Sequence, residues 1–360
     1  MKSNFWYGKN VLITGHTGFK GSWLSLWLSQ LGAHVIGYSL APPKSPSNFV
    51  VSRVGELLYD SVEANIQDLD AVIGCFATQK PEIVFHMAAQ PLVRHSYHNP
   101  VETFHTNVIG TVNVLEAVRK TPSVKAVVVI TSDKCYENRE WPWGYRENEP
   151  MGGHDPYSSS KGCTELVAAS YRSSYFPPSE HAKHGVALAT VRAGNVIGGG
   201  DWSPERLLPD LLNAHAEGRE VVIRNPNAIR PWQFVLEPLG GYMALAERLF
   251  EDGAAYAEAW NFGPREGDAL PVESIIKRLS LRLNGGIRYR VNSDQALHEA
   301  MVLKLDCSKA STRLAWRPRT SIDDALQFIA DWQKSLISGC DMQTVSLKQI
   351  EKFHSITHNI

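Results

Sequence analysis

The hydrophobic positions in the first half of the chain follow two alternating patterns. Short, nearly continuous apolar runs predict buried strands, and longer segments with apolar residues on one face predict the helices between them. The apolar runs lie at residues 9–14, 34–39, 82–85, 125–130 and 186–191. This alternation predicts an α/β fold with a doubly wound parallel sheet, whose ligands bind beyond the carboxyl ends of the strands.

Three helices are predicted among these strands, at residues 19–31, 101–119 and 157–175. In the first of them, Trp27 and neighbouring apolar residues at helical spacing form one face, and Gly32 follows as a C-terminal stop.

The chain changes character after Arg192. Residues 193–234 contain three consecutive glycines together with several proline and aromatic residues, which predicts short elements and loops. Helical periodicity returns at residues 237–251, 272–283 and about 321–337. We expect this part to form a second lobe that caps the sheet and shapes a substrate cleft. Beyond Gly339 the chain is polar, so we expect a loosely ordered tail.

Composition narrows the classes of function. Of the 360 residues, 43% are apolar and 20% are charged, as in ordinary globular proteins. Lys and Arg total 36 against 37 for Asp and Glu, so we expect no nucleic-acid partner held by phosphate contacts. The apolar runs are too short for a membrane span and no signal peptide fits the N-terminus, which predicts a cytoplasmic protein without a membrane partner.

The cysteines and histidines point to neither disulfides nor a metal. The five cysteines are Cys75, Cys135, Cys163, Cys307 and Cys340. No two of them form a CxxC pair and their number is odd, which is typical of reduced cytosolic thiols. The closest histidine pairs, at residues 95/98 and 181/184, have no third ligand nearby in sequence, so we expect no metal site.

A glycine-rich turn joins the first strand to the first helix. Gly15, Gly18 and Gly21 follow the pattern G-x-x-G-x-x-G, which lets the backbone approach a pyrophosphate at the N-terminus of the helix. We therefore expect a dinucleotide cofactor. The second strand ends near Ser39 without a neighbouring Asp, Glu or Arg, which leaves the choice between NAD and NADP open at this position.

Tyr157 and Lys161 form a Tyr-x-x-x-Lys pair on one face of a predicted helix. A free phenol has a pKa of about 10 and is a poor base at neutral pH. A nearby ammonium group stabilises the phenolate, so the pair can take a proton from a substrate hydroxyl while hydride leaves the same carbon.

These motifs resemble those of the extended short-chain dehydrogenase/reductase superfamily. The matching segments lie at residues 15–21, 86–90, 105–117, 131–136, 157–161 and 192–201, and the likeness continues at 230–235 and 298–310. The resemblance implies a Rossmann-type sheet with a smaller C-terminal substrate-binding lobe. Its dinucleotide-binding domain would comprise residues 1–192 plus about 235–262, and its sugar-nucleotide lobe about 193–234 plus 263–360.

The segment after the fifth strand implies the activity. Nucleotide-sugar 4,6-dehydratases of this superfamily carry two ionisable groups after the active-site Ser or Thr, and Ser132 is here followed by Asp133 and Lys134. Lysine at the second position is similar to the CDP-glucose 4,6-dehydratases. The resemblance implies that NAD-assisted loss of water converts CDP-glucose to CDP-4-keto-6-deoxyglucose, which feeds deoxysugars of a cell-surface polysaccharide such as the lipopolysaccharide O-antigen.

The resemblance also implies a role for each catalytic group. Tyr157 deprotonates the 4′-hydroxyl, Ser132 holds that oxygen, and Lys161 orients the cofactor ribose and lowers the pKa of the phenol. Asp133 and Lys134 supply the base at C5′ and the acid at the 6′-hydroxyl, in an order that the sequence leaves open.

Binding residues follow from the same likeness. The cofactor is expected to contact Gly15, Thr17, Gly18, Phe19, Gly21, Ser39, Asn65, Ile66, Ala88, Ala89, Gln90, Asn107, Tyr157 and Lys161. The sugar nucleotide is expected to contact Gln90, Ser132, Asn195, Arg206, Arg230 and His298. Helices near residues 101–119 and 157–175 pair across subunits in such enzymes, which implies a homodimer or a tetramer.

Two other functions are compatible with these motifs. A nucleotide-sugar 4-epimerase or an NADP-linked reductase would use the same Tyr and Lys, although the ionisable pair at residues 133–134 argues against the epimerase. A dinucleotide-sensing protein without catalysis would be expected to lose the Tyr or the Lys, and both are present.

Overall fold

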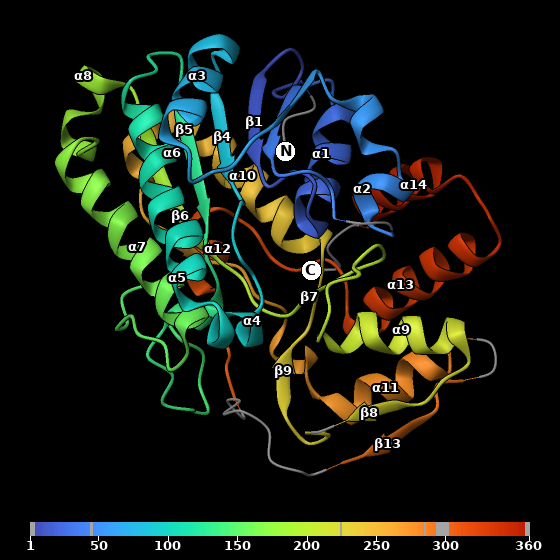
Figure 1. Ribbon diagram of the computed structural model, residues 1–360. Helices are drawn as coiled ribbons and strands as arrows, with labels where there is room; N and C mark the ends of the chain where they lie inside the picture. The colour runs from blue at the N-terminus through green and yellow to red at the C-terminus, as the bar shows by residue number, and fades with distance from the viewer. Residues whose placement is uncertain (1–3, 44–45, 224, 284–285, 293–301, 357–360) are drawn as a thin grey trace.

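The computed structural model describes residues 4–43, 46–223, 225–283, 286–292 and 302–356. Its centre is a seven-stranded parallel sheet with the strand order β11-β6-β5-β4-β1-β2-β3 (Figure 1). The strands are β1 (Asn10–Thr14), β2 (His34–Ser39), β3 (Asp60–Glu63), β4 (Ile83–His86), β5 (Ala126–Ile130), β6 (Ala187–Arg192) and β11 (Ala259–Asn261). The predicted doubly wound parallel sheet is confirmed.

Helices cover both faces of the sheet because successive strand residues point to opposite sides. Val11 and Ile13 of β1 pack with α1 and α10, whereas Leu12 packs with α3, α6 and α7. The helices of these two layers are α1 (Phe19–Gln30), α10 (Leu236–Asp252), α3 (Leu69–Gln79), α6 (Gly110–Arg119) and α7 (Pro156–Ser174). Three shorter helices, α2 (Asn48–Val51), α4 (Val93–His98) and α8 (His181–His184), lie in the connections.

The helix predicted at residues 101–119 is interrupted. It consists of α5 (Pro100–Phe104), a π-helical turn at His105–Ile109, and α6. A π-turn inserts an extra residue into the helical ladder and is frequent at functional sites.

The second lobe combines short strands with helices, and α9, α11, β8, β9 and β13 lie together below the sheet in Figure 1. Its strands are β7 (Val196–Ile197), β8 (Val221–Ile223), β9 (Ile229–Pro231), β10 (Gln233–Phe234), β12 (Ala269–Pro271) and β13 (Tyr289–Val291). Its helices are α9 (Leu207–Glu217), α11 (Val272–Ser280), α12 (Ser308–Arg313) and α13 (Ile322–Ile337). The division into two domains at the residues given above stays a prediction.

The expectation of a loosely ordered tail after Gly339 is wrong. Residues Met342–Ser355 form helix α14, in which Ile350 and Phe353 are buried. The helix packs on α1, where Trp27 Nε1 donates a hydrogen bond of 2.7 Å to His354 Nε2. Within the described ranges, no helix is both long and apolar enough to cross a membrane.

Candidate active site

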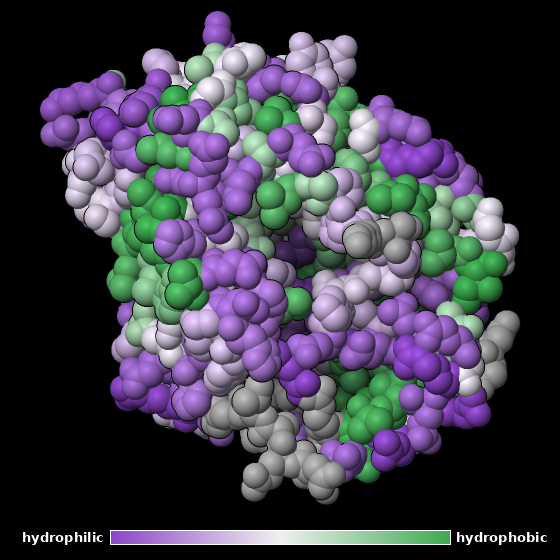
Figure 2. Space-filling model, viewed as in Figure 1, coloured by the Kyte–Doolittle hydropathy of each residue, from purple (hydrophilic) through white to green (hydrophobic). Residues whose placement is uncertain are grey.

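A cavity of about 880 Å³ lies where the carboxyl ends of the strands meet the second lobe. Figure 2 shows the centre of this face of the molecule hollowed, with hydrophilic residues around the opening. The predicted site residues that line it are Phe19, Ser132, Asp133, Lys134, Tyr157, Asn195, Arg206 and Arg230. The cavity thus brings together residues as distant in the sequence as Phe19 and Arg230.

Ser132, Asp133 and Lys134 lie in a 3₁₀ turn directly after β5. Ser132 Oγ accepts a hydrogen bond of 3.2 Å from the Lys134 backbone N–H and donates one of 3.0 Å to Asp133 Oδ1. Asp133 is only 3% exposed, and burial raises the pKa of its carboxyl group against the opposing effects of Lys134 and Ser132. The protonated form of this carboxyl group is thereby favoured.

Gly194 leaves the space that the Asp133 carboxylate occupies. A Cβ atom at this position would lie 1.6 Å from Asp133 Oδ2, so any other residue would displace the carboxylate. The segment after β6 therefore fixes where the acid points, and only glycine is compatible with it.

Tyr157 and Lys161 lie in the first turns of α7, which begins after the cap residue Asp155. Asp155 Oδ1 accepts a 2.9 Å hydrogen bond from the Ser158 N–H, as is typical of a helix N-cap. Burial raises the pKa of Tyr157 to about 12, with a hydrogen bond to Ser132 acting in the opposite direction. In the chain by itself, burial outweighs the lowering of the phenol pKa that the sequence led us to expect.

Lys161 is buried beneath the cavity and does not line it. Its Nζ donates a 3.3 Å hydrogen bond to the carbonyl of Ile130, the last residue of β5. Burial lowers the pKa of Lys161 to about 8. The ammonium group therefore lies at the carboxyl end of β5, and its contact with the cofactor ribose stays a prediction.

A buried ion pair supports the floor of the site. Glu165, one turn after Lys161, accepts two hydrogen bonds of 2.9 Å from Arg192. Its carboxylate also accepts hydrogen bonds from the hydroxyls of Thr131 and Thr190, at 2.5 and 2.7 Å. Because Thr131 precedes the catalytic turn, this pair ties α7 to the ends of β5 and β6.

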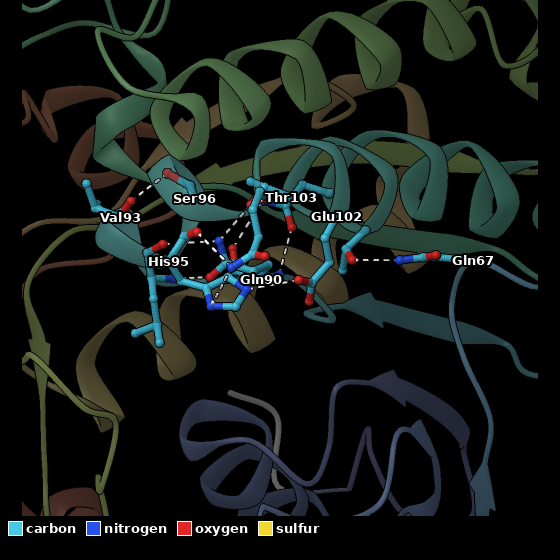
Figure 3. A network of polar contacts seen from close by, with 11 residues as sticks. Gln67, Gln90, Val93, His95, Ser96, Glu102 and Thr103 are labelled. Atoms are coloured by element: carbon cyan, nitrogen blue, oxygen red, sulfur yellow. Dashed lines mark hydrogen bonds and ion pairs between the residues drawn. The ribbon is translucent and has the colours of Figure 1, made fainter.

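A second polar network joins the segment after β4 to α4 and α5, and Figure 3 shows Gln90, Val93, Ser96 and Thr103 in it. Ser96 is fully buried, and its Oγ accepts a 3.1 Å hydrogen bond from the Tyr157 backbone N–H and donates one of 2.5 Å to the Val93 carbonyl. Gln90, which was expected to contact cofactor and substrate, uses its amide group to bond Leu92 and Thr103. Its ligand contacts stay a prediction.

Asn107 lies in the π-turn, and its side-chain amide forms hydrogen bonds with backbone groups. Its Oδ1 accepts a 2.8 Å hydrogen bond from the Gln90 N–H, and its Nδ2 donates to the Gln90 carbonyl and to Ser160 Oγ. Since Ser160 in turn donates to the Tyr157 carbonyl, Asn107 connects the end of β4 to the catalytic helix.

The glycine turn has the geometry of an anion cradle. Gly15 has a φ of +75°, and a Cβ there would lie 2.8 Å from the Ala88 nitrogen. A Cβ on Gly21 would lie 2.2 Å from the Gly15 carbonyl oxygen. Gly18 is the N-cap of α1, no side chain caps the helix and its first turn holds no acid, so free N–H groups remain for a pyrophosphate.

The remaining predicted cofactor contacts lie at the ends of β2, β3 and β4. Thr17 Oγ1 and Ser39 Oγ are hydrogen-bonded at 2.8 Å. Asn65 Oδ1 accepts a hydrogen bond from the Gln67 N–H, and the adjacent Ile66 is buried. Ala88 continues from β4, next to Ala89, and its N–H donates to Thr14 Oγ1 at 3.1 Å.

The second lobe contributes two arginines to the cavity wall. Arg206 Nη1 lies 3.2 Å from Asp201 Oδ2, and the Arg206 side chain keeps 37% of its surface exposed. Arg230 donates to the Ile229 carbonyl and lies close enough to Asp133 to influence its pKa. Asn195 has a φ of 44° and lines the cavity. His298 lies outside the described residues.

Lys20 is a cavity residue that the sequence analysis did not single out. It lies between Gly18 and Gly21 of the glycine turn and is half-buried in the cavity wall. Burial, together with the charges of Lys161 and Arg206, lowers its pKa to about 7. The sequence feature that could have indicated Lys20 is its charge, because the other positions of this turn need only small or apolar side chains.

Comparisons with known proteins agree with this geometry. Residues 12–328 match the family model described as GDP-mannose 4,6 dehydratase. The CDP-glucose 4,6-dehydratase of Salmonella typhimurium is 54% identical over 354 residues, which cover 98% of each chain. The dTDP-glucose 4,6-dehydratase of Streptomyces antibioticus is 26% identical over 344 residues, which cover 90% of this chain and 92% of the relative.

Solved structures share the fold. The UDP-glucose 4-epimerase of Thermotoga maritima with UDP-glucose superimposes with a TM-score of 0.74 at 22% identity, over 91% of this chain and 99% of the other. The dTDP-glucose 4,6-dehydratase of Bacillus anthracis in complex with NAD gives 0.74 at 20% identity, over 93% and 100%. From the family match and the Salmonella relative, the chain belongs to the GDP-mannose 4,6 dehydratase family of the extended short-chain dehydrogenase/reductases.

Proposed function

We propose that this protein is a CDP-glucose 4,6-dehydratase, a hydro-lyase that releases CDP-4-keto-6-deoxyglucose and water. The observation that carries the proposal is the meeting of Tyr157 and Ser132 with two further ionisable groups, Asp133 and Lys134, in one cavity. A 4-epimerase needs no acid and base beyond Tyr157 and Ser132. Elimination of water needs one further acid and one further base. The 54% identity to the Salmonella enzyme supports CDP-glucose as the substrate.

The residues of the glycine turn fit NAD, because the turn leaves N–H groups for a pyrophosphate and has no room for side chains at Gly15 and Gly21. Bound NAD supplies a hydride acceptor for C4′ and, once reduced, the hydride donor for C6′. The net redox change is therefore zero. Lys161, whose Nζ lies 3.3 Å from the Ile130 carbonyl oxygen at the end of β5, would bind the cofactor ribose.

The first proton transfer belongs to Tyr157 and Ser132. The Ser132 hydroxyl, which is hydrogen-bonded to Asp133 Oδ1, lies next to the phenol and can hold the 4′-oxygen between them. Tyr157 takes the proton of the 4′-hydroxyl as the carbon is oxidised. The positive charge of Lys161, one turn further along α7, would stabilise the phenolate.

The elimination belongs to Asp133 and Lys134. The 4′-ketone acidifies the C5′ proton, which Lys134 removes. Asp133 protonates the 6′-hydroxyl, which leaves as water, and Lys134 returns the proton to C5′ as C6′ receives the hydride. We assign the acid to Asp133 because burial favours the protonated form of its carboxyl group.

The enzyme is proposed to act in the cytoplasm as a homodimer and to supply deoxysugars for a cell-surface polysaccharide such as the O-antigen. All five cysteines are free thiols. Val101, Ile109 and Leu166 project from the layer of α5, α6 and α7 with 72%, 43% and 61% of their surface exposed. Apolar side chains on the same helical layer support pairing of these helices across subunits.

The test is incubation with CDP-glucose without any added hydride acceptor. We expect a product that has lost one water by mass spectrometry and carries a 6′-methyl group by NMR. Recovery of the sugar nucleotide inverted at C4′ would identify an epimerase. A stoichiometric requirement for NADPH would identify a reductase.

A further inference from the structure

The cavity has an end that lies away from the catalytic groups. It is formed by α9 and β8, with α11 behind them, and these elements lie together below the sheet in Figure 1. Its walls include the apolar side chains of Leu207, Val221, Ile223 and Val272. Flat apolar walls of this kind fit a nucleobase and exclude the charged part of a sugar nucleotide.

Two cations lie on the way to this end. Arg206 is near enough to Tyr157 to lower its pKa, and Arg230 is near enough to Asp133 to act on that carboxyl group. A guanidinium group binds phosphate through paired hydrogen bonds. With the hexose at Tyr157 and the diphosphate at these arginines, the covalent order of the substrate puts its base beside α9.

Asp210 is the acidic residue of the first turn of α9 and lines the cavity there. It is half-buried, and burial raises the pKa of its carboxyl group. The other two acidic residues of this wall form ion pairs. Glu205 lies 3.7 Å from Arg94, and Asp201 lies 3.2 Å from Arg206. Within the part of the chain that the structure describes, no hydrogen bond or ion pair holds the Asp210 carboxylate.

We propose that Asp210 selects cytosine over uracil and thymine by accepting a hydrogen bond from the exocyclic amino group at C4 of the base. A carboxylate only accepts hydrogen bonds, and cytosine carries a donor where the other two pyrimidines carry a carbonyl oxygen. Two acceptors facing each other would leave both desolvated groups unpaired, which strongly disfavours the wrong base. This inference rests on the proposed function and explains which nucleobase the substrate carries.

The experiment measures the binding of CDP and UDP to the full-length protein by titration calorimetry, so it does not depend on turnover. We expect the wild type to bind CDP at least about ten-fold more tightly than UDP. In Asp210→Asn the amide can serve either base, so the preference should fall to about two-fold or less. Asp210→Ala, which removes the group, should lose the preference as well.

Glu205→Gln is the matched control, because it neutralises a neighbouring acid on the same wall and should change both affinities equally. A CDP preference that persists in both Asp210 variants would overturn the role of Asp210 while leaving the proposed substrate intact. A wild type that binds CDP and UDP equally would overturn the proposed substrate itself.

Discussion

The two walls of the cavity hold their charged side chains in different ways. On the sheet side, Glu165 and Arg192 are 5% and 4% exposed and are joined by two hydrogen bonds of 2.9 Å. On the lobe side, Arg206 keeps 37% of its side chain exposed and lies 3.2 Å from Asp201, and Glu205 lies 3.7 Å from Arg94 of α4. Half-exposed pairs contribute little to stability and exchange partners easily.

The difference in burial and pairing indicates that the two walls have different functions. The sheet wall fixes Ser132, Asp133 and Tyr157 through buried hydrogen bonds, as groups that move protons must be held in place. The lobe wall keeps its cations available, as groups that bind a diphosphate must be. Substitutions on the first wall should therefore reduce turnover, and those on the second should weaken substrate binding.

Replacement of Tyr157 by Phe should have the largest effect. It removes the group that takes the 4′-proton and leaves the packing of the ring unchanged, so kcat should fall about 10³-fold. Tyr175→Phe, at the exposed C-terminal end of the same helix, is the control and should keep full activity. A Tyr157→Phe enzyme within ten-fold of the wild type would show that another group is the base.

Lys134→Ala should lower overall turnover about 10²-fold, because the variant lacks the base for the elimination. It should still oxidise the sugar, which is seen as reduced cofactor in absorbance at the first turnover. In deuterated water the C5′ proton should no longer exchange with solvent. Full exchange in this variant would place the base elsewhere.

Arg206→Ala tests the lobe wall. Loss of one cation for the diphosphate should raise the KM for CDP-glucose about ten-fold, with kcat changed by only a few-fold. Arg248→Ala, an exposed arginine on α10, serves as the control. A drop in kcat with unchanged KM would mean that Arg206 acts in the chemistry and that the two walls do not divide their tasks.

Lys20→Met should have the smallest effect, on the pH dependence of stability. The pKa of Lys20 is lowered to about 7 in the folded chain, below its value of about 10.4 when unfolded, so the unfolded state binds more protons between these values. The free energy of unfolding should therefore rise with pH from 7 to 8.5 in the wild type. The variant should lose about 1 kcal/mol of this rise per pH unit in urea denaturation.

An equal pH slope in wild type and Lys20→Met would show that Lys20 is charged and paired in the folded protein. Lys161, whose pKa is lowered to about 8, contributes in the same direction above that pH and remains in both proteins.

The sequence predicts the elements in which apolar residues recur at regular spacing. It does not predict the elements that depend on contacts with distant parts of the chain. The buried strands and α13 were predicted because apolar residues mark them continuously. Strand β3 was not, because its residues Asp60–Glu63 are mostly exposed and polar. The sequence predicts a tail in place of helix α14 because the few apolar residues of this helix are buried only by packing against α1 and neighbouring elements.

The same holds for the site. Tyr157 and Lys161 are four residues apart, so local spacing reveals them. The supports of Tyr157 are not local: Ser96 is 61 positions away along the chain, and Arg192 lies 27 positions from Glu165. These groups come together only when the sheet folds, so no local sequence pattern predicts their contacts.

The most direct test of the central claim follows the hydrogen at C4′. CDP-glucose labelled with deuterium at C4′ is converted by the enzyme in ordinary water, and the product is examined by NMR. Oxidation at C4′ followed by hydride return predicts deuterium in the 6′-methyl group. Deuterium that stays at C4′ of an inverted sugar, or that is lost entirely to solvent, would contradict the assignment of this cavity to 4,6-dehydration.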